Sequence, residues 1–292
     1  MNTILSMSKN KEKQKKALII QGGGFRTGFS TGVLDAFQTY GYNEFDVYIG
    51  VSGGAIALSY FLSEQYQCCF DAMCLLATDK NFMSYSRMMS DTGVMDIDYF
   101  HEVSSTKIPL DLNKLISNSE EKEVSIVLTN RTTGKPKHFQ PNSKTWVDAV
   151  IASCTLPFVT KGKHLLQGVE YMDGGWSDPL PVESAYKNGA KEIVVIRTSP
   201  PDLKADQTWS DYFGSFVFSS NKKLQNCFEN SHLKYNKSID FINSCPKDLD
   251  IKQIAPDSPL RAGTYSNSIE AITVDYRYGV QAGVNFLSSL KH

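Results

Sequence analysis

The chain has 292 residues, of which 41% are hydrophobic and 21% charged, a composition typical of a globular protein with a substantial core. Its 30 basic and 31 acidic residues give a formal net charge of −1, without the basic excess common in nucleic-acid-binding proteins. We therefore expect no nucleic-acid partner. Six cysteines without a CxxC pair favour free thiols over a disulfide framework or a zinc site.

Residues 1–16 are predicted to form a basic tail, with five lysines between Lys9 and Lys16. In a signal peptide the charges come before an apolar core, whereas here they come after a very short apolar stretch; no apolar stretch approaches the ~18 residues of a membrane span. We expect a cytoplasmic protein whose lysines are available for transient contact with the inner membrane surface, at ~1 kcal/mol for each charge. The alternative is a tail that is simply solvated.

Apolar runs and glycine clusters alternate in the first part of the chain. They predict strands at 17–20 and 45–50, each followed after glycines by a helix, at 28–40 and 55–62. Further strands are predicted at 124–129, 171–172 and 192–198, and helices at 145–154 and from 269 onward. Residues 65–107 follow no clear pattern. The alternation is typical of an α/β protein with a parallel sheet. We expect one domain over 17–292, with the motifs in 17–198 and a helical or irregular part in 199–292.

The first motif with chemical meaning is Gly50-Val51-Ser52-Gly53-Gly54, a G-x-S-x-G sequence. Between a strand and a helix, this pattern predicts a nucleophile elbow, in which a sharp turn lifts the serine hydroxyl above the sheet. Gly50, Gly53 and Gly54 leave room for the turn. The alternative is a tight turn with an incidental serine.

A second motif, Gly22-Gly23-Gly24-Phe25-Arg26, follows the first predicted strand. Converging backbone N–H groups in such a loop bind an anion, either a nucleotide phosphate or the oxyanion of an acyl-transfer intermediate. The sequence lacks G-x-x-x-x-G-K-[ST] and only approximates G-x-G-x-x-G. With a predicted nucleophile one βα unit later, the oxyanion hole is the favoured interpretation.

The third motif is Asp173-Gly174-Gly175 at the end of a predicted strand. A carboxylate in this position can accept a proton from a serine and act as general base. Taken alone, the motif would predict only a turn. Its meaning comes from the presence of the other two motifs.

These three motifs, in this order, resemble those of the patatin-like phospholipases. The segment from Ala152-Ser153 to Pro157 resembles the family's A-S-x-x-x-P segment, and the stretch after Asp173 resembles the family's as well. The Gly32-Val33-Leu34-Asp35 sequence is similar to that of the bacterial cytoplasmic members.

The resemblance implies a three-layer α/β/α sandwich with a mostly parallel central sheet. It also implies Ser52 as nucleophile, Asp173 as its only base, and an oxyanion hole formed by Gly22, Gly23, Gly24 and the Arg26 backbone. The substrates would be fatty-acyl esters of (lyso)phospholipids or related lipids, and no cofactor or metal would be required. Thr27 departs from the family, which commonly has glycine there, and would be strained if the turn required a positive φ.

Three other functions are compatible with the same residues. An acyltransferase would use the same pair of residues with another acceptor. A triad esterase would add His232, which follows Ser52 and Asp173 in the order Ser, Asp, His. A non-catalytic lipid-binding protein would retain only the pocket. The apolar stretches 82–95 and 209–218 are candidates for an acyl pocket or a lid.

Overall fold

The computed structural model describes residues 14–88 and 90–290. Most of the predicted basic tail lies outside these residues, and its last two lysines already belong to the first strand. The described residues form an eight-stranded sheet. Its strands are β1 (Lys15–Ile20), β2 (Val47–Val51), β3 (Glu123–Asn130), β4 (Pro136–Phe139), β5 (His164–Leu166), β6 (Val169–Asp173), β7 (Ala190–Ile196) and β8 (Asp250–Ile254).

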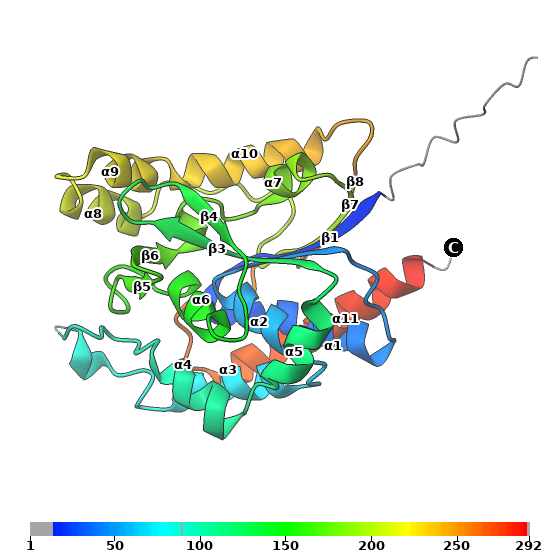
Figure 1. Ribbon diagram of the computed structural model, residues 1–292, viewed down its shortest axis with the longest axis horizontal. Helices are drawn as coiled ribbons and strands as arrows, with labels where there is room; N and C mark the ends of the chain where they lie inside the picture. The colour runs from blue at the N-terminus through cyan, green and yellow to red at the C-terminus, as the bar shows by residue number, and fades with distance from the viewer. Residues whose placement is uncertain (1–13, 89, 291–292) are drawn as a thin grey trace, which may run out of the picture.

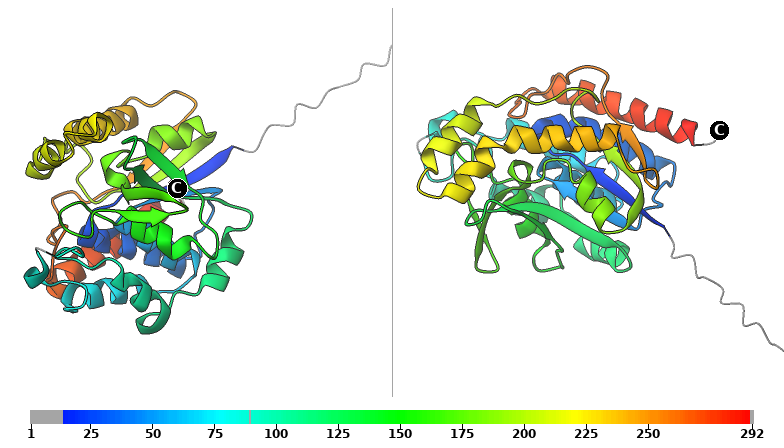
Figure 2. Two further views of the ribbon diagram at one scale, coloured as in Figure 1. Left: turned by 60° about the vertical axis from the view of Figure 1, so that its left-hand side comes forward. Right: turned by 90° about the horizontal axis from the view of Figure 1, so that it is seen from above.

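The helices lie on both faces of this sheet, in the three layers visible in Figure 1 and in the rotated views of Figure 2. One layer contains α7 (Val182–Lys187), α8 (Trp209–Val217), α9 (Lys222–Glu229) and α10 (Ser231–Asn243). The opposite layer contains α1 (Gly28–Thr39), α2 (Gly53–Leu62), α3 (Cys68–Thr78), α4 (Tyr99–Glu102), α5 (Leu112–Ser119), α6 (Trp146–Ser153) and α11 (Ile269–Ser289). The expected α/β/α sandwich is confirmed.

Strands β3, β2, β1, β7 and β8 are parallel neighbours in that order, while β4, β5 and β6 pair in antiparallel fashion at the β3 side. Side chains alternate across the sheet as its pleat requires. In β1, Leu18 and Ile20 enter the core beneath α1 and α2, whereas Ala17 and Ile19 enter the core beneath α7 and α10. The sheet is therefore mostly parallel, as expected.

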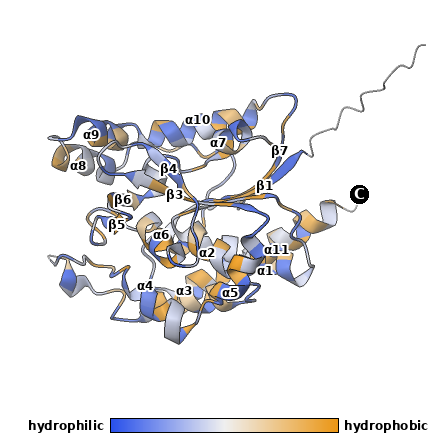
Figure 3. Ribbon diagram, in the orientation of Figure 1, coloured by the Kyte–Doolittle hydropathy of each residue, from blue (hydrophilic) through white to orange (hydrophobic). Residues whose placement is uncertain are grey.

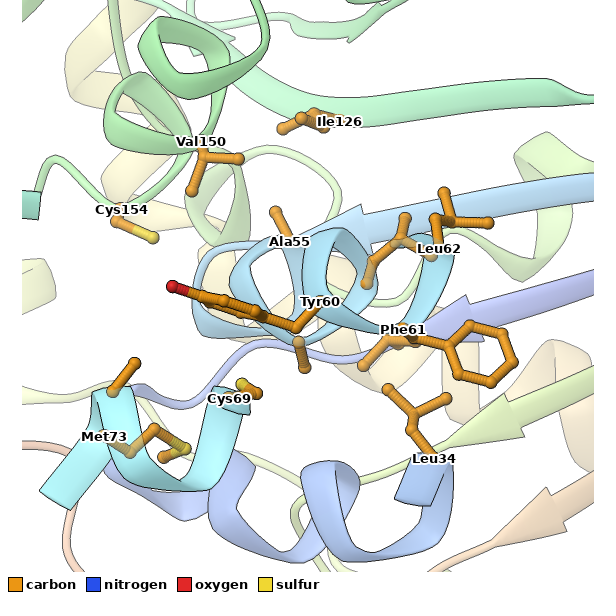
Figure 4. Close-up of a cluster of buried hydrophobic side chains, with 14 of the residues drawn as sticks. Leu34, Ala55, Tyr60, Phe61, Leu62, Cys69, Met73, Ile126, Val150 and Cys154 are labelled. Atoms are coloured by element: carbon orange, nitrogen blue, oxygen red, sulfur yellow. The ribbon is translucent and has the colours of Figure 1, made fainter. Parts of the chain in front are cut away.

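Helix α2 is buried nearly all around, which explains its almost uninterrupted apolar sequence. Figure 4 shows its Tyr60 and Leu62 among side chains of the surrounding elements, including Val150 of α6 and Met73 of α3. Because α2 is fixed on all sides, the turn that precedes it has a fixed position.

Helix α11 closes the fold by packing along α1. A Cβ at Gly32 would lie 2.0 Å from the Tyr276 carbonyl oxygen, and one at Gly279 would lie 1.9 Å from the Phe29 carbonyl oxygen. The two helices thus touch backbone to backbone. The C-terminal segment, predicted as helical or irregular, contributes both this helix and strand β8 to the core.

Candidate active site

Ser52 occupies the turn between β2 and α2 with φ 52° and ψ −129°. A positive φ is uncommon for a residue with a side chain and persists only where the surroundings enforce it. They do so here: a Cβ at Gly50 would lie 2.7 Å from the Ala55 Cα, and one at Gly54 would lie 2.4 Å from the Ile20 carbonyl oxygen. The predicted G-x-S-x-G motif therefore has the geometry of a nucleophile elbow.

Ser153 supports this strained turn, a role that the sequence did not reveal. Its Oγ accepts a hydrogen bond from the Ser52 N–H at 2.8 Å and donates one to the Val127 carbonyl oxygen at 2.8 Å. Both serines are buried, so the backbone N–H at Ser52 would otherwise have no partner. The only sequence signal was the A-S-x-x-x-P segment that contains Ser153.

The register of the sheet brings Asp173 to Ser52. Leu128 of β3 pairs with β4 on one edge and with Asp173 of β6 on the other, and Val127 pairs with Val51 of β2. A strand has only two edges, so β2 and β6 occupy the same edge of β3, one after the other. Because β2 is parallel to β3 and β6 antiparallel, their C-terminal ends meet. Ser52 and Asp173, 121 positions apart in sequence, lie at that junction.

The Ser52 hydroxyl donates a hydrogen bond to Asp173 Oδ2 at 2.6 Å, and the Gly175 N–H donates one to Oδ1 at 2.7 Å. The carboxyl group is buried, and burial raises the pKa of Asp173 from its usual 3.8 to about 6, against the opposing effect of these two hydrogen bonds. Near neutral pH, the carboxylate is thus ionised and a better proton acceptor than an exposed aspartate.

The glycine loop lies directly against the serine. A Cβ at Gly22 would be 2.8 Å from both the Ser52 Cβ and the Val51 carbonyl oxygen, so only glycine fits there. The Arg26 N–H, predicted as part of the oxyanion hole, donates to the Gly23 carbonyl oxygen at 3.2 Å and is not free for that role, whereas the N–H groups of Gly22, Gly23 and Gly24 have no acceptor among the described residues. They are available to an oxyanion formed at Ser52.

Thr27 is accommodated without strain. Its φ of −68° is ordinary, and its hydroxyl donates to the Gly24 carbonyl oxygen at 2.5 Å. The loop therefore does not require a positive φ at the position where the family commonly has glycine.

Two cavities meet at Ser52. One is a cleft of ≈ 420 Å³ with both polar and apolar residues in its wall; we call it the polar cleft because charged side chains, among them Arg26 and Asp173, line it together with His232. The other cavity is narrower and apolar. It is lined by Ile56, Met73, Leu76, Phe82, Met95 and Ile97. The predicted acyl-pocket stretch 82–95 thus contributes to the apolar cavity. The stretch 209–218 instead forms exposed helix α8 near the mouth of the polar cleft.

His232 lies in the wall of the cleft, yet no hydrogen bond joins it to Ser52 or Asp173. Its Nδ1 is buried without a partner, and the Ser52 hydroxyl already donates to the carboxylate. The geometry therefore favours a pair of residues over a triad.

Within residues 14–88 and 90–290, no group of three His, Cys, Asp or Glu side chains is arranged to hold a metal ion. Over the same residues, no helix is both long and apolar enough to cross a membrane.

A glycine loop, a strained serine and a buried aspartate thus meet at one end of the sheet of an α/β/α sandwich, an arrangement that suits acyl transfer through a serine. Comparison with protein-family models then identifies the family. The chain belongs to the patatin-like phospholipase family, whose model matches residues 18–186. A second model, a domain of unknown function (DUF6363), matches residues 221–292.

Among curated proteins, the chain is 30% identical over 276 residues to the uncharacterized protein YjjU of Escherichia coli K12, covering 94% of this chain and 77% of that protein. Among solved structures, it matches VipD from Legionella pneumophila with a TM-score of 0.44 and 13% identity. That match covers 95% of this chain and 67% of VipD.

Proposed function

We propose that the protein is a serine acyl hydrolase that cleaves fatty-acyl esters of (lyso)phospholipids or related lipids. The observation that carries this proposal is the position of Ser52 at the meeting point of an apolar cavity and a polar cleft. An amphiphilic ester bound across the two would place its acyl chain in the first, its leaving group in the second and its carbonyl at the serine.

In the proposed reaction, Asp173 accepts the hydroxyl proton as Ser52 Oγ attacks the ester carbonyl. The Gly22 and Gly23 N–H groups stabilise the oxyanion, an effect worth about 10²–10³ in rate for each donor. Collapse of the intermediate expels the alcohol, which takes the proton from Asp173, and leaves acyl-Ser52. Asp173 then accepts a proton from water as the water attacks. The products are a free fatty acid and the regenerated serine.

Arg26 suggests the charge of the leaving group. Its side chain lines the polar cleft, and none of the described carboxylates forms an ion pair with it. Burial lowers the pKa of its guanidinium, although arginine stays charged in proteins. An unpaired, partly buried cation favours a phosphate-bearing leaving group over a neutral one.

The test is turnover of a lysophospholipid and of a monoacylglycerol with the same acyl chain, followed by release of free fatty acid. Wild-type protein should release fatty acid, and Ser52→Ala should release none while keeping its circular dichroism spectrum. Arg26→Gln should lose more activity on the lysophospholipid than on the monoacylglycerol. Activity retained in Ser52→Ala would refute the mechanism. Appearance of a new ester in place of free acid would identify an acyltransferase.

A further inference from the structure

Helix α8 presents its large apolar side chains to solvent. Trp209 is 89% exposed and Phe216 is 76% exposed, whereas the buried residues of the helix are Asp211 and Gly214. This is the reverse of an ordinary amphipathic helix on a globular protein. With Phe158 and Leu203, the helix forms an exposed apolar surface, which we call the α8 surface; its members are Phe158, Leu203, Trp209, Tyr212, Phe213, Phe216 and Val217.

Close packing holds α8 in this orientation. A Cβ at Gly214 would lie 2.4 Å from the Phe228 ring, so the backbone of α8 rests directly on that ring. Thr208 and Asp211 form a capping box at the start of the helix, and the Ser231 hydroxyl donates to Asp211 Oδ1 at 2.5 Å. The outward direction of the aromatic side chains is therefore built into the fold.

The α8 surface is continuous with the site. Leu203, Thr208, Ser210 and Asp211 line the polar cleft that contains Ser52. On the other side, the Phe158 ring packs edge-on against Phe213, with centroids 4.7 Å apart. Figure 1 shows α8 at one end of its layer, and Figure 3 shows hydrophobic stretches in it at the edge of the molecule.

The chemistry of this surface fits a lipid bilayer. Between Thr208 and Asn221 the only charged residue is Asp211, which is buried, and the exposed Lys222 and Lys223 follow directly. One exposed acidic residue, Glu229, accepts a hydrogen bond from Ser215 of α8 at 3.0 Å. Trp and Tyr partition to the boundary between headgroups and acyl chains, and neighbouring lysines attract anionic headgroups. An exposed apolar surface of this kind marks an interaction site.

We propose that α8 docks the protein on bilayers that contain anionic phospholipid, with the mouth of the Ser52 cleft facing the membrane. This inference rests on the proposed function only for the identity of the substrate. An amphipathic helix in this position lies in the plane of the interface with its apolar face inserted. A lipid ester can then enter the cleft without crossing water.

The test uses vesicles of phosphatidylcholine with and without phosphatidylglycerol, and Ser52→Ala protein so that lipid hydrolysis cannot interfere. Trp209 serves as the reporter, because its exposed indole should shift to shorter emission wavelength on binding. Cosedimentation of the same vesicles measures affinity. The double variant Trp209→Ser/Phe216→Ser should bind the vesicles at least about ten-fold more weakly. The reason is that each aromatic side chain would bury on the order of 150–250 Å² in the bilayer. Lys222→Gln/Lys223→Gln should lose roughly five-fold per lysine on anionic vesicles only.

The matched control is Tyr40→Ser/Leu290→Ser, which removes two exposed apolar side chains elsewhere. It should bind vesicles as the parent protein does. Equal binding by the α8 variant and its parent would overturn the inference. So would an α8-dependent dimer in solution that does not bind vesicles, because the α8 surface would then be an interface between two copies.

The two proposals can fail separately. In the wild-type background, Trp209→Ser/Phe216→Ser should hydrolyse a soluble short-chain ester normally but vesicle lipid at least about ten-fold more slowly. Vesicle binding by α8 without any esterase activity would remove the proposed function and leave the docking surface. Esterase activity without α8-dependent binding would do the opposite.

Discussion

Replacing Asp173 by asparagine is expected to stabilise the protein at neutral pH while removing its activity. The native state holds the Asp173 carboxylate in a buried position with only two hydrogen-bond donors, from Ser52 and Gly175. Asparagine has nearly the same shape and carries no charge. The substitution therefore removes the cost of burying an ionised group and leaves the packing unchanged.

The magnitude follows from the pKa. Burial raises the pKa of Asp173 from 3.8 to about 6. At ~1.4 kcal/mol for each pH unit, the ionised native state is disfavoured by about 3 kcal/mol. This figure is already the net of burial and of the two hydrogen bonds to the carboxylate, so the expected gain is about 3 kcal/mol. For a chain of this size, that raises the melting temperature by roughly 2 °C per kcal/mol.

The direction of the pKa shift determines how the stability difference between variant and wild type changes with pH. The folded-state pKa of Asp173 lies above the unfolded value, so the wild type loses stability as the pH rises from 3.8 toward 6, and the full loss is present above about 6. Asp173→Asn should therefore melt at a higher temperature than wild type at pH 8 and at the same temperature below pH 4. Thermal unfolding by circular dichroism measures both. Equal or lower stability of the variant at pH 8 would refute the reasoning.

Three further outcomes are expected. In wild-type protein, kcat/KM should fall with decreasing pH through an apparent pKa of about 6, because Asp173 must be ionised to accept the serine proton; a fall only near pH 4 would contradict this. Ser153→Ala should lower kcat, and it should lower the free energy of unfolding by about 1–3 kcal/mol, because the buried Ser52 N–H loses its acceptor. An unchanged midpoint of urea unfolding would contradict this prediction. Gly22→Ala should lower kcat by about 10²-fold or more by displacing Ser52, whereas Gly263→Ala, with open space at its Cβ, should retain activity in the same ester assay.

The parts of the structure that were predictable are those with local signals. The strand at Ala17–Ile20 and the helix after Ser52 are short apolar runs bounded by glycines, and they lie in β1 and α2. The three motifs fall at strand ends, where such residues can meet. Local pattern was therefore sufficient for the α/β class and for the positions of the three motifs at strand ends.

Other elements depend on distant contacts. Helix α3 has apolar residues around most of its circumference and no polar stripe, so its sequence has no clear period. Strand β8 is short, and its pairing with β7 places it in the sheet. The encounter of Ser52 with Asp173 depends on β2 and β6 sharing one edge of β3, a register that no local pattern encodes.

The outward direction of the α8 aromatic residues also escaped sequence analysis. Aromatic residues at helical spacing usually pack in a core, and the acyl pocket or lid considered for the stretch 209–218 was the alternative to that role. The close approach of Gly214 to the Phe228 ring determines the actual orientation. Such a contact between separate helices becomes visible only in the fold.

The central claim is that Ser52 and Asp173 form the acyl-transfer site without a histidine. Covalent labelling by a fluorophosphonate, read by mass spectrometry of the peptide that contains Ser52, tests it most directly. We expect rapid labelling at Ser52 in wild type and in His232→Ala, and much slower labelling in Asp173→Asn. Normal labelling of Asp173→Asn together with loss of labelling in folded His232→Ala would contradict the claim and identify His232 as the base.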